Sequence, residues 1–411
     1  VIGDLQSVYD CLGFQCSDVG AYLTDSLPQC ADIPVNLPLA EYRPTTRVHS
    51  HSKIDLDVLQ IKILSSMEAY SFAKMLYLYG RNSPLPQDDD NVPYRLRTLH
   101  GFATTADRTA ANPFYSDFAS YFNDPNYADT VIIQTLDGQG KWGGASTEQR
   151  TEVISDTCAF QVLYMHALTE LGSAMSACNN KAVRSSTGAH QWDEVAAYLI
   201  GSLEGPNAGG AVDLEDGQLV WSLANRRAFQ FQTENKEGFS EINVHLEDLL
   251  FAGKAQINSF DCGNLAKTAD RIQHLILLPI IQSTLRYALI NKDLPSSSPS
   301  KDLSAGETFA LSVLPVVQRY DGESAQVIEE NMVLRSGVQP VQNGPQFVAD
   351  AFYRALDDFG YSCILVGATP EVDACQLGGG IGAVRGAASG ASTFQLLTSL
   401  TLLSLCTLGM L

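Results

Sequence analysis

The sequence predicts an all-α protein, with two packed helical bundles joined by long irregular connections. Apolar residues recur at spacings of three and four over most of residues 54–359, which is typical of amphipathic helices. Strand signal is scarce: only residues 130–133, Thr-Val-Ile-Ile, have the β-branched density expected of a strand. The composition, 45% apolar and 18% charged, is that of an ordinary folded protein.

The first helical pattern runs from residue 54 to about residue 79, and Gly80 and Pro84 end it. Residues 81–145 form a long irregular segment, which is either functional or hides short helices. Ser146 and Gln149 then make a capping box that opens a helix, on which His166 and Glu170 lie one turn apart. The remaining helices are expected at residues 188–203, 219–231, 241–260, 265–289, 305–334 and 346–359, with prolines interrupting two of them.

The net charge indicates which partners the protein can bind, and the cysteine content indicates its compartment. The chain has 26 basic and 46 acidic residues, a net charge of −20 that argues against nucleic acid or an anionic membrane surface as partners and suits cations. Its 9 cysteines include no Cys-X-X-Cys pair, which favours disulfides and an oxidising compartment. We interpret the start at Val1 as that of a processed or truncated product.

One motif occurs near both ends of the chain. Residues 13–20 and 360–367 share the pattern Gly-aromatic-X-Cys-X-X-Val-Gly, which indicates tandem repeats. Residues 1–31 are then the tail of a preceding repeat, and 32–376 are one full repeat. The spacings within Cys16–Cys30 and Cys363–Cys375 predict two equivalent local disulfides. Spacing does not decide how four other cysteines pair: Cys11, Cys158, Cys178 and Cys262. A bond between Cys178 and Cys262 is conceivable.

Residues 377–411 differ from the rest of the chain. Residues 378–392 are rich in Gly, Ala and Ser, and residues 394–411 contain no charge. A small-residue spacer before an apolar end resembles a signal for glycolipid attachment. A C-terminal membrane helix is the alternative, but the segment is barely long enough and lacks a basic anchor. We expect this segment to hold the protein at an outer membrane face.

The stretch around Trp192 is the best candidate for a functional site. On a helix, His190, Glu194 and Tyr198 line one stripe and Asp193 flanks it. Such groups on a mostly buried helix require pairing or a metal ion. The alternative is a helix amino terminus with acidic residues in its first turn. His49 and His51 fall in a polar loop, where histidines are usually solvated.

Several short motifs, in this order, resemble the algal iron-assimilating (low-carbon-dioxide-inducible) protein family. They are Ser-Lys-Ile-Asp-Leu-Asp at 52–57, Glu-Gln-Arg-Thr-Glu-Val-Ile at 148–154, Trp-Asp-Glu-Val-Ala-Ala-Tyr at 192–198, Trp-Ser-Leu-Ala-Asn-Arg-Arg at 221–227, and the closing motif. The resemblance covers 32–376. It implies an extracellular or periplasmic protein, or one on the outer face of the plasma membrane, that takes part in high-affinity iron uptake, with an iron reductase or permease as a possible partner. Relatedness to phytotransferrins implies Fe(III) bound together with carbonate.

Ferric iron is a hard cation that prefers carboxylate and phenolate oxygens with an occasional imidazole. The central helix offers such donors in Asp193, Glu194 and Tyr198, with His190 as a further one. Additional donors could come from neighbouring helices, although a surface or salt-bridge role is the alternative for each: Glu68, Tyr70, Glu152, Glu241, His245 and Glu247.

Two rival classes of function remain. The Glu-X-X-His pair of di-iron oxidases, the His-Glu-X-X-His of zinc hydrolases and the Gly-X-Ser-X-Gly of acyl-transfer enzymes are all absent from the sequence. We therefore expect a protein that is not an enzyme. A cell-wall or adhesion repeat without a metal is the stronger rival, because tandem repeats and a surface anchor suit it equally.

Overall fold

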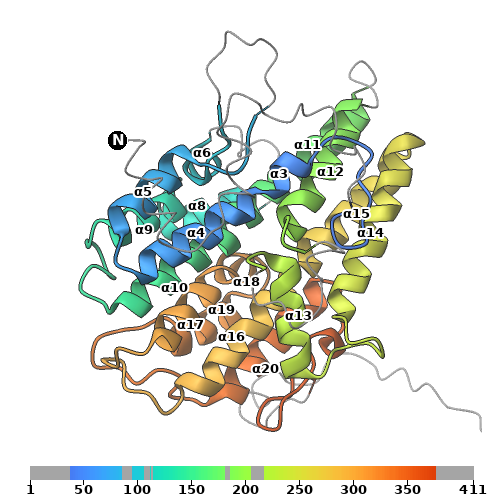
Figure 1. Cartoon of the computed structure of the whole chain (residues 1–411). Helices are drawn as coiled ribbons and strands as arrows, with labels where there is room; N and C mark the ends of the chain where they lie inside the picture. The colour runs from blue at the N-terminus through green and yellow to red at the C-terminus, as the bar shows by residue number, and fades with distance from the viewer. Residues whose placement is uncertain are drawn as a thin grey trace, which may run out of the picture. The chain divides into compact units, whose positions relative to one another are not determined.

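The computed structural model describes residues 38–85, 95–105, 112, 114–180, 186–204 and 217–375. In these residues the chain forms helices joined by turns and four isolated β-bridges, and no strand occurs among them (Figure 1). The all-α prediction is confirmed. The chain divides into two compact units, 1–378 and 379–411, and every described residue belongs to the first. Within the described part, no helix has both the length and the apolar character needed to cross a membrane. The expected anchor lies outside it.

The helices of the first half are short at the start and longer toward the centre. They are α3 (His49–Ser52), α4 (Ile54–Ser66), α5 (Tyr70–Tyr79), α6 (Leu99–Thr104), α8 (Tyr115–Phe122), α9 (Tyr127–Leu136), α10 (Thr147–Thr157), the π-helix η3 (Cys158–Leu163), α11 (Tyr164–Asn179) and α12 (Ser186–Ile200). The predicted capping box opens α10: the Ser146 hydroxyl accepts the backbone N–H of Gln149, and the Gln149 side chain accepts that of Ser146.

The second half continues with helices of one to five turns. They are α13 (Val220–Phe231), α14 (Glu241–Asn258), α15 (Cys262–Leu275), α16 (Leu278–Asn291), α17 (Lys301–Leu311), α18 (Leu314–Tyr320), α19 (Gly322–Met332), α20 (Pro345–Asp358) and the 3-10 turn η4 (Cys363–Leu365). Pro279 and Pro315 stand in the first turns of α16 and α18, where a missing N–H costs nothing. Each proline therefore begins a new helix instead of bending a long one.

Two further details of the predicted helices are wrong. The helix expected over 54–79 is broken at Glu68, whose φ of 60° is left-handed. The N–H groups of Glu68 and Ala69 bond back to the carbonyls of Ser65 and Leu64, which closes α4 as a helix C-terminus normally closes. Residues 130–133 lie inside α9 and form no strand, because tertiary packing of Ile132 overrides the weak β preference.

The helices form two groups that share one hydrophobic core. Helices α11, α12, α14 and α15 pack on one another beside α3–α10, and α13 packs with α16–α20 (Figure 1). Helix α10 joins the groups, because it contacts both α4 and α17. Gly253 of α14 lets α12 approach closely, since a Cβ there would lie 1.9 Å from the ring of Trp192. The Trp192 Nε1–H donates to the Leu250 carbonyl at 2.9 Å.

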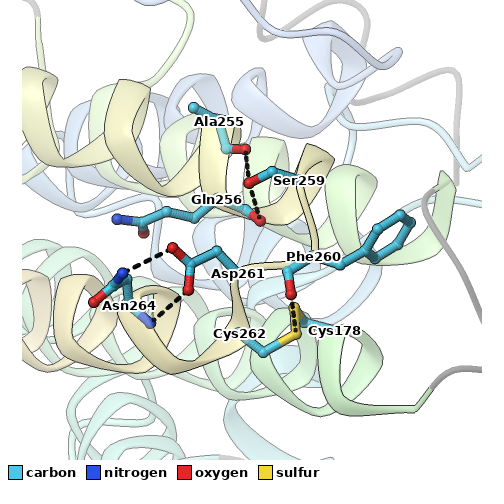
Figure 2. The surroundings of a disulfide bond; sticks show 8 residues. All are labelled: Cys178, Ala255, Gln256, Ser259, Phe260, Asp261, Cys262 and Asn264. Atoms are coloured by element: carbon cyan, nitrogen blue, oxygen red, sulfur yellow. Dashed lines mark hydrogen bonds between the residues drawn. A yellow bond between two sulfur atoms is a disulfide. The ribbon is translucent and has the colours of Figure 1, made fainter.

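Two disulfides occur among the described cysteines. Cys178 at the end of α11 bonds to Cys262 at the start of α15, beside Asp261, which caps α15 (Figure 2). The predicted Cys363–Cys375 bond is present and closes the turn after α20. Cys158 is a free, buried thiol in η3. The predicted Cys16–Cys30 bond lies outside the described residues.

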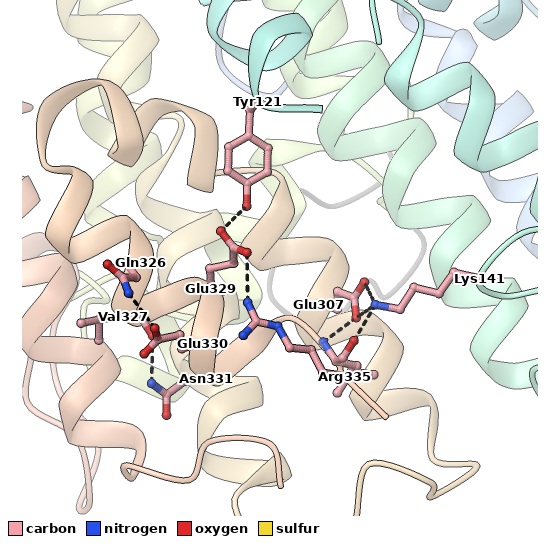
Figure 3. Close-up of polar contacts among 10 residues, drawn as sticks. Tyr121, Lys141, Glu307, Gln326, Val327, Glu329, Glu330, Asn331 and Arg335 are labelled. Atoms are coloured by element: carbon pink, nitrogen blue, oxygen red, sulfur yellow. Dashed lines mark hydrogen bonds and ion pairs between the residues drawn. The ribbon is translucent and has the colours of Figure 1, made fainter. Parts of the chain in front are cut away.

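A polar network fastens the loop before α10 to the second half of the chain. Lys141 contacts both carboxylate oxygens of the buried Glu307, at 2.5 and 2.6 Å, and the Leu334 N–H also donates to Glu307 (Figure 3). Nearby, the Tyr121 hydroxyl donates to Glu329 at 3.2 Å, so that α8 is tied to α19. These contacts hold the two groups of helices together where α10 packs on α17.

Candidate metal centre

His51 is the most buried member of a cluster of metal-binding side chains. Helix α3 packs against α12, and the His51 residue is only 1% exposed. Its Nε2 lies 2.7 Å from Glu194 Oε1, while its Nδ1 is buried without a hydrogen-bond partner. The expectation that this histidine is solvated is wrong. Burial comes from long-range packing, of which the surrounding polar sequence carries no sign.

Helix α12 supplies the other members of the cluster. His190 and Glu194 are one turn apart, with Nε2 of His190 3.5 Å from Oε1 of Glu194. The rings of His51 and His190 meet edge to face, with centroids 5.2 Å apart. One donor atom from each of these three residues lies within 4.8 Å of the other two, and no other such group of three occurs in the described part of the chain.

Further polar groups surround these three. Glu170 of α11 lies close enough to Glu194 for the charge of Glu194 to raise its pKa. His166 lies one turn before Glu170, with its Nε2 3.8 Å from Glu170 Oε1. The π-helix η3 precedes α11 directly, and its wider turn helps set which face of α11 carries His166 and Glu170. The ring of Phe102 stacks on His166 at 3.6 Å.

Arg97 and Tyr198 close the inner side of the cluster. The Arg97 guanidinium contacts His51 Nε2 and lies near the Tyr198 phenol. The loop holding Arg97 is fixed by its backbone N–H, which donates to the Ser83 carbonyl at 2.8 Å, and by the Ser83 hydroxyl, which donates to Ser50 in α3. A cation therefore stands next to the histidine and the phenol.

The two carboxyl groups of the cluster, those of Glu194 and Glu170, have very different pKa values. Burial alone would raise the pKa of Glu194, but the hydrogen bond from His51 and the nearby charges of His51, His190 and His166 lower it to about 2. Burial, and then the charge of Glu194, raise the pKa of Glu170 to about 8. Burial also raises the pKa of Tyr198 and lowers that of His51. Glu194 is thus the carboxylate that is charged over the whole physiological range.

The three donor side chains could bind a metal ion that enters from solvent. The side chains become less exposed along the cluster, from 38% at His190 through 14% at Glu194 to 2% at His51. Ligand atoms each about 2.1 Å from an ion stand at most about 4.2 Å apart, so donors within 4.8 Å need to move only a few tenths of an ångström. Two imidazoles and a carboxylate, with a second carboxyl and a phenol close by, fit a transition metal of borderline or hard character.

The structure assigns Asp193 a different position from the one predicted. Its residue is fully buried, and its Oδ1 accepts the Tyr42 hydroxyl at 2.6 Å. Its Oδ2 accepts the backbone N–H groups and the hydroxyls of Thr45 and Thr46, at 2.8 to 3.1 Å. These donors occupy the carboxylate, so Asp193 has no free oxygen for a metal ion. Asp193 is therefore placed apart from the cluster, with donors on both of its oxygens.

Of the predicted donors, His190 and Glu194 lie in the cluster and Tyr198 lies at its edge. Four others join no group of metal-binding side chains among the described residues. Glu68 ends α4 and accepts the Thr147 hydroxyl at 2.8 Å. Glu152 lies between Lys62 and Lys301, at 3.9 and 3.5 Å. The other two belong to the first turns of α14: Glu241 and His245.

Sequence reasoning did not assign His51, Glu170 and Arg97 to the site. The spacing of His166 and Glu170 was readable, since a histidine and a glutamate four residues apart share a helix face. Arg97 belongs to the segment expected to be irregular, and only the folded chain brings it to α3. His51 had no local signal at all.

Together, the all-helical domain and the cluster on α3, α11 and α12 define a disulfide-containing helical protein with a candidate metal centre. A sequence model of the family described as low iron-inducible periplasmic protein matches residues 30–289, and the chain belongs to this family. The match spans every residue of the cluster. It confirms the resemblance that the motifs indicate, the link to iron uptake and the periplasmic localisation. No curated protein and no solved structure matches the chain.

Proposed function

We propose that the protein binds one ferric ion through His51, His190 and Glu194 and takes part in high-affinity iron uptake outside the cell. The observation that carries the proposal is the convergence of these three donors within 4.8 Å, in a chain that belongs to an iron-responsive family. The donors come from α3 and α12, which only the folded chain brings together. A ferric ion would join them.

The neighbours of the three donors favour iron in its ferric state. Glu170 and Tyr198 place a second carboxyl and a phenol beside Glu194, and a trivalent hard cation prefers such oxygen ligands. Arg97 adds a positive charge on the inner side of the cluster. Because that charge would favour an anion between it and the metal, we propose that carbonate binds together with iron at Arg97.

The same geometry supports binding over the rival functions. A cell-wall or adhesion repeat without a ligand gains nothing from a buried imidazole whose Nδ1 lacks a partner, since that group costs stability. We propose a carrier and not an enzyme, held at the outer membrane face through residues 377–411, which passes its iron to a reductase or permease.

The test is iron binding by the purified full chain. Ferric iron supplied as the nitrilotriacetate chelate should bind with one ion per chain and raise the melting temperature. A ligand at 1,000 times its Kd stabilises the fold by about 4 kcal/mol. His51→Ala should abolish the shift, and His245→Ala, on α14, should leave it intact. Absence of iron binding by the parent, or unchanged binding by His51→Ala, would contradict the proposal. Removal of bicarbonate should weaken binding by the parent.

A further inference from the structure

Thr46 connects the buried Asp193 to His190. The Thr46 hydroxyl oxygen lies 2.8 Å from Asp193 Oδ2 and 3.1 Å from His190 Nδ1. The same Asp193 oxygen accepts the backbone N–H groups of Thr45 and Thr46, each at 2.8 Å. Since two backbone donors already point at it, Oδ2 acts as an acceptor toward the hydroxyl as well.

The directions of these hydrogen bonds follow from counting protons. A threonine hydroxyl has one proton to donate and lone pairs to accept with. Its proton goes to the Asp193 carboxylate, which has none to give. At 3.1 Å the remaining partner, His190 Nδ1, must then be the donor, because two lone pairs facing each other would repel. His190 therefore carries a proton on Nδ1.

In the neutral ring this assignment leaves His190 Nε2 without a proton; its 3.5 Å separation from Glu194 Oε1 is longer than a normal hydrogen bond. Nε2 is the ring nitrogen 3.5 Å from Glu194 Oε1, so it is also the nitrogen that belongs to the cluster. A metal ion binds an imidazole through its unprotonated nitrogen, and a hydrogen bond from the other nitrogen fixes the tautomer and the ring orientation. His51 lacks such a device, since its Nδ1 has no partner.

We propose that Thr46, held in place by Asp193, is a positioning residue that fixes the Nδ1–H tautomer and the orientation of His190 and so prepares Nε2 for a metal ion. The inference rests on the proposed function for the identity of the ion, but the tautomer itself is a property of the metal-free protein. Asp193 thereby contributes to the centre through Thr46, without contacting the ion. Loss of an equivalent support in other metal sites lowers affinity roughly 10- to 100-fold.

Thr45 provides a matched control for Thr46. Its hydroxyl donates to the same Asp193 oxygen, at 3.1 Å, whereas the hydroxyl that meets His190 is that of Thr46. Thr46→Val and Thr45→Val each remove one hydroxyl and keep the backbone N–H that bonds Asp193. Thr46→Ser keeps the hydroxyl and should behave as the parent.

Two measurements on the full chain test the proposal. The first is ¹⁵N NMR of histidine-labelled, metal-free protein, in which the His190 resonances, assigned with His190→Gln, report which nitrogen is protonated. The second is affinity for ferric nitrilotriacetate, with Co²⁺ as a second probe. Thr46→Val should shift His190 away from the Nδ1–H form and weaken binding roughly 10- to 100-fold, while Thr45→Val and Thr46→Ser match the parent.

The outcomes separate this proposal from the proposed function. An Nε2–H form of His190 in the parent, or parental affinity in Thr46→Val, would overturn the role of Thr46 even if iron binds. Equal losses in Thr45→Val and Thr46→Val would assign both residues a purely structural role and also overturn it. If neither metal binds the parent but Thr46→Val still changes the tautomer, the positioning of His190 stands and the ferric function fails.

Discussion

Replacement of Glu194 by glutamine removes the charge of the central carboxylate and keeps its shape. In the native protein Glu194 is ionised at every ordinary pH, because its hydrogen bond with His51 and the neighbouring histidines outweigh its burial and lower its pKa to about 2. Two opposite unit charges 4 Å apart contribute about 4 kcal/mol at the effective dielectric of a partly buried site. A ligating carboxylate lies closer to the ion and faces a higher charge.

The amide oxygen of glutamine recovers part of this interaction, so we expect a loss of at least about 2.7 kcal/mol, or a 100-fold weaker Kd for ferric iron. Titration of the parent and Glu194→Gln against nitrilotriacetate, followed by iron content after gel filtration, measures the difference. The fold should survive, because the amide oxygen of the substituted side chain can still accept a hydrogen bond from His51. Helical content by circular dichroism checks this point.

Glu241→Gln is the matched control for Glu194→Gln. It is the same substitution, made in the first turn of α14 and outside the cluster. Its effect should be confined to the favourable placement of an acid at a helix amino terminus, about 0.3–1 kcal/mol of stability. Equal ferric affinity in Glu194→Gln and the parent, or equal losses in the two variants, would refute the assignment of Glu194 as a ligand.

Two further predictions concern stability. Replacing Cys178 and Cys262 together by serine should lower the free energy of unfolding by about 4.5 kcal/mol, and replacing Cys363 and Cys375 by about 3 kcal/mol. The first bond closes the longer loop, since it joins residues 84 apart and the second joins residues 12 apart. Urea unfolding of both variants should rank them in this order, and the reverse order would contradict the loop-entropy argument. Burial, and next the charge of Glu152, raise the pKa of Asp156 to about 7. The folded carboxyl keeps a proton that the unfolded chain loses above about pH 4, so its stability contribution is present at low pH and is lost as the pH rises through 7. Asp156→Asn should therefore raise the free energy of unfolding at pH 8 by roughly 4 kcal/mol and have little effect at pH 4. An equal effect at both pH values would show that titration of the buried carboxyl is not the cause.

The fold class could be predicted because it depends on local patterns. Apolar spacing and the capping box at Ser146 are properties of adjacent residues, and both survive in the structure. The break at Glu68 could not be predicted, because a left-handed backbone conformation is normally signalled by glycine and this position holds a glutamate. The irregular segment 81–145 contains the short helices α6, α8 and α9, whose stability comes from packing and not from propensity.

Of the candidate metal centre, only the part on α12, which contributes His190 and Glu194, could be predicted from the sequence. The stripe of His190, Glu194 and Tyr198 follows from helical spacing, and the structure keeps all three on the side facing the cluster. Spacing could not decide between Asp193 and Glu194, because adjacent acids on a helix point about 100° apart and either could face inward. The Tyr42 and Thr46 contacts decide it, and they link residues 151 and 147 apart in sequence.

The two neighbouring acids on α12, Asp193 and Glu194, have different roles in the centre. Asp193 uses its whole carboxylate to hold the 42–46 segment, which leads directly into α3 and hence to His51. Glu194, about 100° further round the helix, has its Oε1 2.7 Å from His51 Nε2. Because α3 is only 4 residues long, it has little stability of its own, and its place depends on these contacts. The buried carboxylate of Asp193 thus fixes where His51 stands, and Glu194 and His190 of the same helix supply the charge and the second histidine that an ion would meet.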